Sequence, residues 1–79
     1  MKINITGRKV PISQSFTQRV EKKLKKLEKF FDSDALAEVT ITQERNLQRV
    51  EVTIRQGGML FRAEEAETEA IDALDKLID

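Results

Sequence analysis

The sequence predicts a single α+β domain in the order β-α-β-β-β-α, with a four-stranded mixed sheet and two helices packed on one face. Four short segments alternate apolar and polar residues, as strands with one buried face do. Two other segments space their apolar residues for one face of a helix. Because 79 residues allow only one modest core, residues 1–79 are expected to form one domain.

The first strand and the first helix follow from residue spacing. Ile3 and Ile5 alternate with polar residues, which predicts a short half-buried strand. A helix is expected from Ser13, whose hydroxyl suits an N-cap, to Phe31, just before Asp32-Ser33-Asp34. Its apolar residues share one face: Phe16, Val20, Leu24, Leu27 and Phe31.

Three further strands and a second helix complete the expected order. The apolar strand residues are Ala37, Val39 and Ile41, then Val50, Val52 and Ile54, then Met59, Phe61 and Ala63. Gly57-Gly58 predicts a type I′ hairpin, because both central residues of that turn need positive φ. A further turn is expected near Arg45-Asn46. The second helix should begin between Glu65 and Thr68, where acidic residues suit the helix dipole.

The connections between the strands predict the topology. The first strand reaches the second through a helix, which indicates a right-handed crossover and a parallel pair. The other strands should form an antiparallel meander. The sheet face away from the helices is expected to be polar and to carry Asn4, Thr40, Thr42, Glu51, Thr53, Arg55 and Arg62.

The net charge of zero hides a strong asymmetry along the chain. Residues 1–31 carry nine basic and two acidic side chains, a net charge of +7. Residues 32–79 carry five basic and twelve acidic side chains, a net charge of −7. Such a separation of charge indicates a charged partner for one surface.

The basic residues gather on one side of the first helix. At about 100° per residue, six cations fill one sector of about 160°, whereas Glu21 and Glu28 lie on the other flank. The six are Arg19, Lys22, Lys23, Lys25, Lys26 and Lys29. Like charges four residues apart weaken a helix, so this pattern favours a polyanion-binding surface over a merely solvated one. A membrane-bound surface is less favoured because the small core needs the apolar stripe of this helix. Lysine suits phosphates more than base edges, which favours structured RNA over sequence-specific DNA.

Catalysis and metal binding are not expected. The chain has no histidine and no cysteine, and nothing in it resembles a nucleophile with its base. The carboxylates Glu64, Glu65, Glu67 and Glu69 lack the spacing of known metal loops, and no cofactor is expected. No apolar run approaches the roughly 20 residues of a membrane span. The lack of cysteine fits a cytoplasmic protein.

Several short motifs resemble the ribosome hibernation-promoting factor and ribosome-associated inhibitor (factor Y) family. They are Asn4-Ile5-Thr6-Gly7, the run from Lys26 to Asp32, Gly57-Gly58, Arg62-Ala63-Glu64 and Ala70-Ile71-Asp72. The resemblance implies a fold similar to double-stranded-RNA-binding domains. It also implies a bacterial-type stress factor that binds small-subunit rRNA in the channel for messenger and transfer RNA and blocks translation.

The resemblance also assigns residues to RNA binding. Lys23, Lys26 and Lys29 match the basic pattern of the family, and Arg19, Lys22 and Lys25 share their surface. We also expect Arg8 and Lys9, which precede the helix, to bind RNA. The family's second helix continues into a basic tail, whereas Lys76 is the only cation here.

Two alternatives therefore stay open. The C-terminal end is either truncated or divergent, and a missing C-terminal region would be one route to self-association. The alternative function is a protein-interaction module, or an N-terminal fragment of a longer dimerising protein that does not bind RNA by itself.

Overall fold

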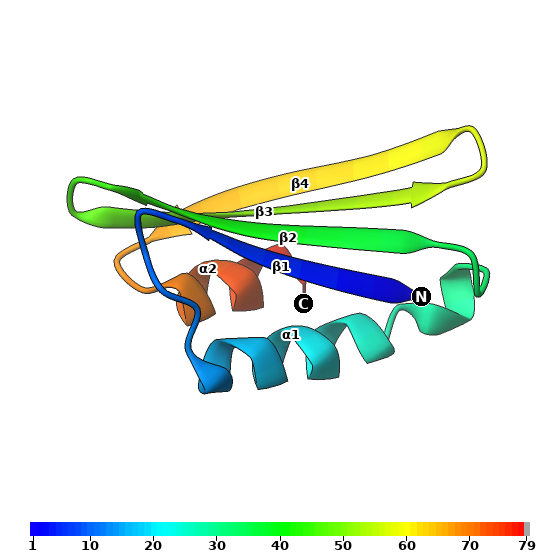
Figure 1. Ribbon diagram of the computed structural model, residues 1–79, viewed down its shortest axis with the longest axis horizontal. Coiled ribbons are helices and arrows are strands. Elements are labelled where there is room, and N and C mark those ends of the chain that lie inside the picture. Colours follow the sequence, from blue (N-terminus) through cyan, green and yellow to red (C-terminus); the bar gives the residue numbers. More distant parts are fainter. Residues whose placement is uncertain (79) are drawn as a thin grey trace.

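The computed structural model describes residues 1–78 and has the predicted order of elements. One four-stranded sheet forms one layer, and both helices lie beneath the same face (Figure 1). The elements are β1 (Lys2–Arg8), α1 (Gln14–Lys25), the 3₁₀ turn η1 (Glu28–Phe30), β2 (Leu36–Glu44), β3 (Leu47–Gln56), β4 (Met59–Glu67) and α2 (Ala70–Leu77). The predicted α+β class is confirmed.

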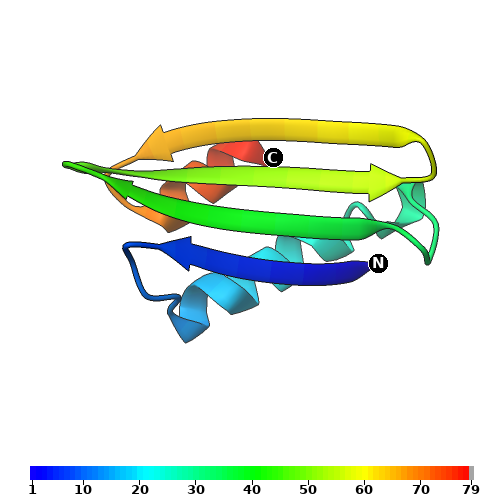
Figure 2. The same ribbon diagram turned by 45° about the horizontal axis from the view of Figure 1, so that its top comes forward.

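The sheet is mixed, as its connections predict. Its order is β1-β2-β3-β4, with β1 parallel to β2 and the other neighbours antiparallel. The crossover through α1 returns the chain to the same sheet, so β1 and β4 become the two outer strands. Figure 2 shows α1 beneath the β1 side of the sheet and α2 beneath the β4 side.

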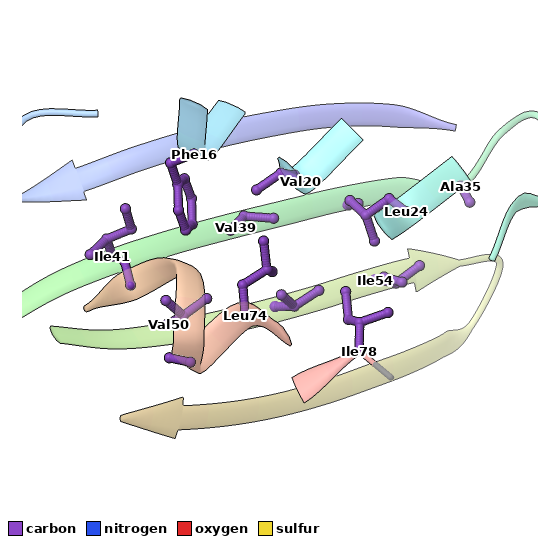
Figure 3. Packing of buried hydrophobic residues seen from close by; sticks show 14 residues of the cluster. Phe16, Val20, Leu24, Ala35, Val39, Ile41, Val50, Ile54, Leu74 and Ile78 are labelled. Atoms are coloured by element: carbon purple, nitrogen blue, oxygen red, sulfur yellow. The ribbon is translucent and has the colours of Figure 1, made fainter. Parts of the chain in front are cut away.

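The core lies between the sheet and the two helices. Phe16, Val20 and Leu24 of α1 are fully buried, and Leu74 of α2 meets them over the middle strands (Figure 3). Every buried side chain among residues 1–78 is apolar. Because α1 commits this whole face to the core, only its other flanks are available to a partner.

The opposite sheet face is polar, as predicted. Along β2 and β3, buried residues alternate with partly exposed ones. Cross-strand ion pairs cover this face: Arg49 Nε lies 3.0 Å from Glu44 Oε1, Arg55 Nε lies 3.5 Å from Glu38 Oε1, and Arg62 bonds to Glu51. The basic side chains of this face are thus largely matched by carboxylates.

The prediction of a type I′ turn at Gly57-Gly58 is wrong in detail. The turn does join β3 to β4 with two residues, but only Gly57 has a positive φ, of 57°. Positive φ at the first central residue alone is the pattern of a type II′ turn. The turn near Arg45-Asn46 is also confirmed, and there Arg45 has a φ of 51°.

The first helix is shorter than predicted. The α-helix ends at Lys25, and η1 replaces its last expected turn. Phe31 is extended, with φ −131° and ψ 153°, and its ring packs edge-on against Phe61 with 5.3 Å between centroids. The backbone N–H of Asp32 donates to the Gln56 side chain. These contacts with β3 and β4 hold the chain out of helical geometry, which spacing alone cannot show.

The second helix begins later than predicted. Glu69 is the N-cap residue of α2, and Asp72 is the acidic residue of its first turn. The carboxylates of Glu64, Glu65 and Glu67 belong to β4, which extends to Glu67 and pairs with β3 along its length. Strand pairing with β3 outweighs the favourable dipole interaction that a helix start there would have given.

Candidate RNA interface

Four of the predicted site residues are free cations on one surface. Lys22 and Lys25 lie on α1, Lys26 caps its end, and Lys29 lies on η1. All four are exposed, and among residues 1–78 none of them forms an ion pair. We call Lys22, Lys25, Lys26 and Lys29 the lysine surface. Four exposed lysines within eight residues of chain, with no ion-pair partner among residues 1–78, create a local positive potential.

Arg19 and Lys23, by contrast, face α2. Arg19 Nη1 donates to both carboxylate oxygens of Asp75, at 2.9 and 2.7 Å. Lys23 Nζ lies 3.5 Å from Asp75 Oδ1 and donates to the Ile78 carbonyl oxygen at 3.1 Å. The side chain of Lys23 is only 17% exposed. These two cations connect the helices, so the structure separates them from the lysine surface.

The Asp75 carboxylate is the centre of this connection. Its hydrogen bonds from Arg19 lower its pKa below the ordinary value, which desolvation alone would raise. Lys23 also places a positive charge at the C-terminal end of α2, where the helix dipole favours cations. Arg19 and Lys23 therefore have a structural role that sequence reasoning missed, because helical projection does not show where α2 packs.

Arg8 and Lys9 lie apart from the lysine surface. Arg8 ends β1, and Lys9, with a φ of 64°, begins the connection to α1. The twelve residues of α1, about 18 Å of helix, separate this connection from η1. A Cβ at Gly7 would overlap the Val10 carbonyl oxygen, so glycine permits this tight exit from the strand. Both cations are exposed, but they form a second, smaller basic site.

Phe30 is a candidate residue that sequence reasoning missed. Its side chain is 66% exposed, although Phe31 beside it packs on Phe61. Lys29 Nζ lies 5.3 Å from the centre of the Phe30 ring. Helical spacing gives no signal that Phe30 is exposed, because at about 100° per residue it would lie only about 40° from Phe16, beside the apolar stripe. Its exposure accompanies the end of α1 at Lys25, which spacing alone does not show.

No other type of site stands out in the part of the chain described. Residues 1–78 contain no group of carboxylates arranged to hold a metal ion. None of the helices in that range has the length and apolar character that crossing a membrane requires. An open cavity of about 430 Å³ lies between the end of α2 and β4, but its lining is mostly apolar, with Phe31, Phe61 and Leu77 among its residues.

Fold and surface together define a small α+β domain with one basic helical flank. The family model of Sigma 54 modulation protein / S30EA ribosomal protein matches residues 3–79, so the chain belongs to that family. The resemblance seen in the sequence motifs is thereby confirmed. The family comprises ribosome-associated hibernation factors and is not a known enzyme family.

Curated relatives and solved structures agree with this family. The chain is 29% identical to the ribosome hibernation promoting factor of Azotobacter vinelandii, over all of this chain and 74% of that protein. It is 34% identical to the ribosome hibernation promotion factor of Deinococcus radiodurans, over 95% of this chain but only 42% of that protein.

Two solved structures share the fold over nearly the whole chain. The N-terminal domain of Protein Y from Thermus thermophilus superimposes with a TM-score of 0.86 and 30% identity, over 100% of this chain and 89% of that one. A ribosomal subunit interface protein from Coxiella burnetii gives a TM-score of 0.84 at 20% identity, over 99% and 86% of the two chains. The second likeness concerns the fold alone.

Proposed function

We propose that residues 1–79 act as one ribosome-binding domain of a cytoplasmic hibernation factor. The domain binds small-subunit rRNA in the channel for messenger and transfer RNA, and it blocks translation under stress by occupying that channel. The single observation that carries this proposal is the lysine surface, where four exposed cations have no carboxylate partner among residues 1–78. Family membership supplies the ribosome as the partner.

Binding through the lysine surface requires no chemical step. Each ammonium group acts as a point charge toward a phosphate, and release of the phosphate's counterions favours binding. The proposed inhibition is steric: a folded domain of 36 × 22 × 20 Å fills space that an RNA ligand would otherwise occupy. We therefore propose that the domain is not an enzyme.

The charge separation orients the domain toward RNA. The basic residues concentrate before residue 32, and the acidic residues concentrate after it, chiefly on strands β2 to β4 and on α2. An RNA surface attracts the first group and repels the second, so electrostatic steering favours approach with α1 foremost. A chain with no net charge thus still has one strongly preferred binding face.

Co-sedimentation with purified small ribosomal subunits tests this proposal. Four phosphate contacts predict that log affinity falls by roughly 3–4 units per unit of log salt concentration. Reversing all four charges of the lysine surface to glutamate should abolish binding. The control variant Arg45→Glu/Arg55→Glu reverses charges on the β2–β3 turn and the open sheet face and should still bind. Undiminished binding by the fourfold variant would refute the proposed interface.

A further inference from the structure

β4 is an outer strand of the sheet, and half of its backbone groups face away from β3. Gln56 pairs with Met59 across the two-residue turn, and such a turn closes on a hydrogen-bonded pair. Every second residue from Met59 therefore bonds to β3. The residues between them direct their N–H and C=O groups outward: Leu60, Arg62, Glu64 and Ala66.

The same outer edge begins with exposed apolar side chains. Met59, Leu60 and Phe61 are 59%, 53% and 42% exposed, and they are three of the five large exposed hydrophobic residues among residues 1–78. Proteins usually protect such edges with charged side chains, above all lysine, with proline or with a bulge. β4 has neither proline nor lysine, and its pairing with β3 continues over nine residues without a bulge. Its charged residues, Arg62, Glu64, Glu65 and Glu67, are of both signs, so this edge is open to another strand in a register that sets opposite charges against each other.

A second copy of the chain fits this edge in one register. In a dimer with twofold symmetry, antiparallel strands place residues of the same sheet face opposite each other. The symmetry axis must then pass between one residue and the same residue of the second copy. With the axis at Ala63, Arg62 lies opposite Glu64 of the second copy, and this pair occurs twice. With the axis at Arg62, Glu64 or Glu65, two like charges meet, which destabilises a cross-strand pair. With the axis at Phe61, Arg62 lies opposite Leu60 and gains no carboxylate partner.

The backbone pattern agrees with the register that the charges select. With the axis at Ala63, Leu60 pairs with Ala66 of the second copy and Arg62 pairs with Glu64. These four are the residues whose N–H and C=O groups point outward. Arg62 already bonds to Glu51 through Nη2, and its guanidinium has further N–H donors for a second carboxylate.

We propose that two copies of this chain pair antiparallel through β4 about Ala63 and form one continuous eight-stranded sheet. The lysine surface lies on α1 and η1. α1 lies beneath the β1 side of the sheet (Figure 2), whereas η1 leads into Phe31, which packs on Phe61 of β4. Pairing through β4 therefore leaves the α1 lysines, Lys22 and Lys25, open in both copies. The proposal concerns a protein surface and does not depend on ribosome binding.

A single cysteine tests the register directly, because the chain has no cysteine of its own. Ala63 is exposed and would face itself as a non-hydrogen-bonded pair, with about 4.5 Å between Cα atoms. That distance lies within the range of a disulfide. Under mild oxidation, Ala63→Cys should form a disulfide-linked dimer at least tenfold faster than Ser15→Cys, an exposed control on α1. Equal rates would overturn the register.

A charge exchange tests the same pairing by sedimentation equilibrium, without ribosomes. The natural chain should dimerise with a Kd below about 1 mM. Arg62→Glu and Glu64→Arg should each weaken dimerisation at least tenfold, because each places like charges opposite. The double variant should restore it to within threefold. A natural chain that stays monomeric at that concentration, or a double variant that does not recover dimerisation, would overturn the proposal. Neither result would bear on the proposed ribosome binding.

Discussion

Arg19 and Lys23 differ from Lys22 and Lys25 in what they contact, although all four lie on α1. The first pair bonds to Asp75 of α2, whereas the second pair is exposed and has no ion-pair partner among residues 1–78. The difference shows that a basic helical face can contain two kinds of cation. One kind connects the two helices, and the other is exposed and has no ion-pair partner in the part of the chain described.

The largest expected effect comes from removing the free cations. Lys22→Ala/Lys25→Ala should lower affinity for small subunits roughly 50-fold at 0.1 M salt. For each phosphate contact, affinity varies inversely with about the 0.9 power of the salt concentration, so losing two contacts removes that factor twice. The slope of log affinity against log salt concentration should become shallower by about one unit for each lysine removed. Filter binding or co-sedimentation across a salt series measures both quantities.

Arg19→Ala/Lys23→Ala is the matched control, because it removes the same charge from the same helix. It should change affinity less than about fivefold. Its free energy of unfolding in urea should fall by roughly 1 kcal/mol, since the lost pair with Asp75 is partly exposed and screened. If the two double variants lost affinity equally, the distinction between the two kinds of cation would be wrong.

Phe30 sharpens the comparison at the end of the lysine surface. Its exposed ring beside Lys29 can stack on an unpaired base, an interaction that contributes about 1–3 kcal/mol per base. We expect Phe30→Ala to lower affinity roughly fivefold, near the weak end of that range. Phe30→Trp should retain affinity, because it keeps an aromatic face. An alanine variant that binds as well as the natural chain would exclude stacking.

The strands, the direction in which they pair and the buried faces of the two middle strands could largely be predicted from the sequence. Apolar and polar residues alternate from Ala37 to Ile41 and from Val50 to Ile54, and the apolar ones are those that the sheet buries. This pattern can be read from the sequence because successive residues of a strand point to opposite faces of the sheet. The end of α1 could not be predicted in the same way. It depends on contacts of Phe31 and Asp32 with strands that follow much later in the chain.

The candidate site was predictable only as a set of residues. The helical period places Arg19 and Lys23 beside the apolar stripe. It cannot show that Asp75, 56 residues later than Arg19, packs next to them in the fold. The sequence therefore identified the basic surface and could not divide it. The RNA-binding roles of all eight residues stay predictions, and the variants above test six of them: Arg19, Lys22, Lys23, Lys25, Lys26 and Lys29.

The smallest expected effect comes from Asp75, which holds Arg19 and Lys23 away from the lysine surface. Asp75→Asn removes the charge that binds them and should raise affinity for small subunits about two- to threefold. The same change should lower the free energy of unfolding by roughly 1 kcal/mol or less, because the pair is more than a third exposed. Lys76→Asn is a control on the same helix whose partner is Glu67, and it should leave affinity nearly unchanged.

The contribution of Asp75 to stability should depend on pH. Arg19 lowers the pKa of this carboxyl below its ordinary value of 3.8, so the folded state favours the charged form. The stabilisation is fully present above that ordinary value and is lost as pH falls through the lowered one. Urea unfolding at pH 7 and pH 5 should therefore give the same difference between the natural chain and Asp75→Asn, and unfolding below pH 3 should give a smaller one. A difference that persists unchanged in acid would mean that the carboxylate charge does not hold Arg19, and that packing alone separates the two kinds of cation on α1.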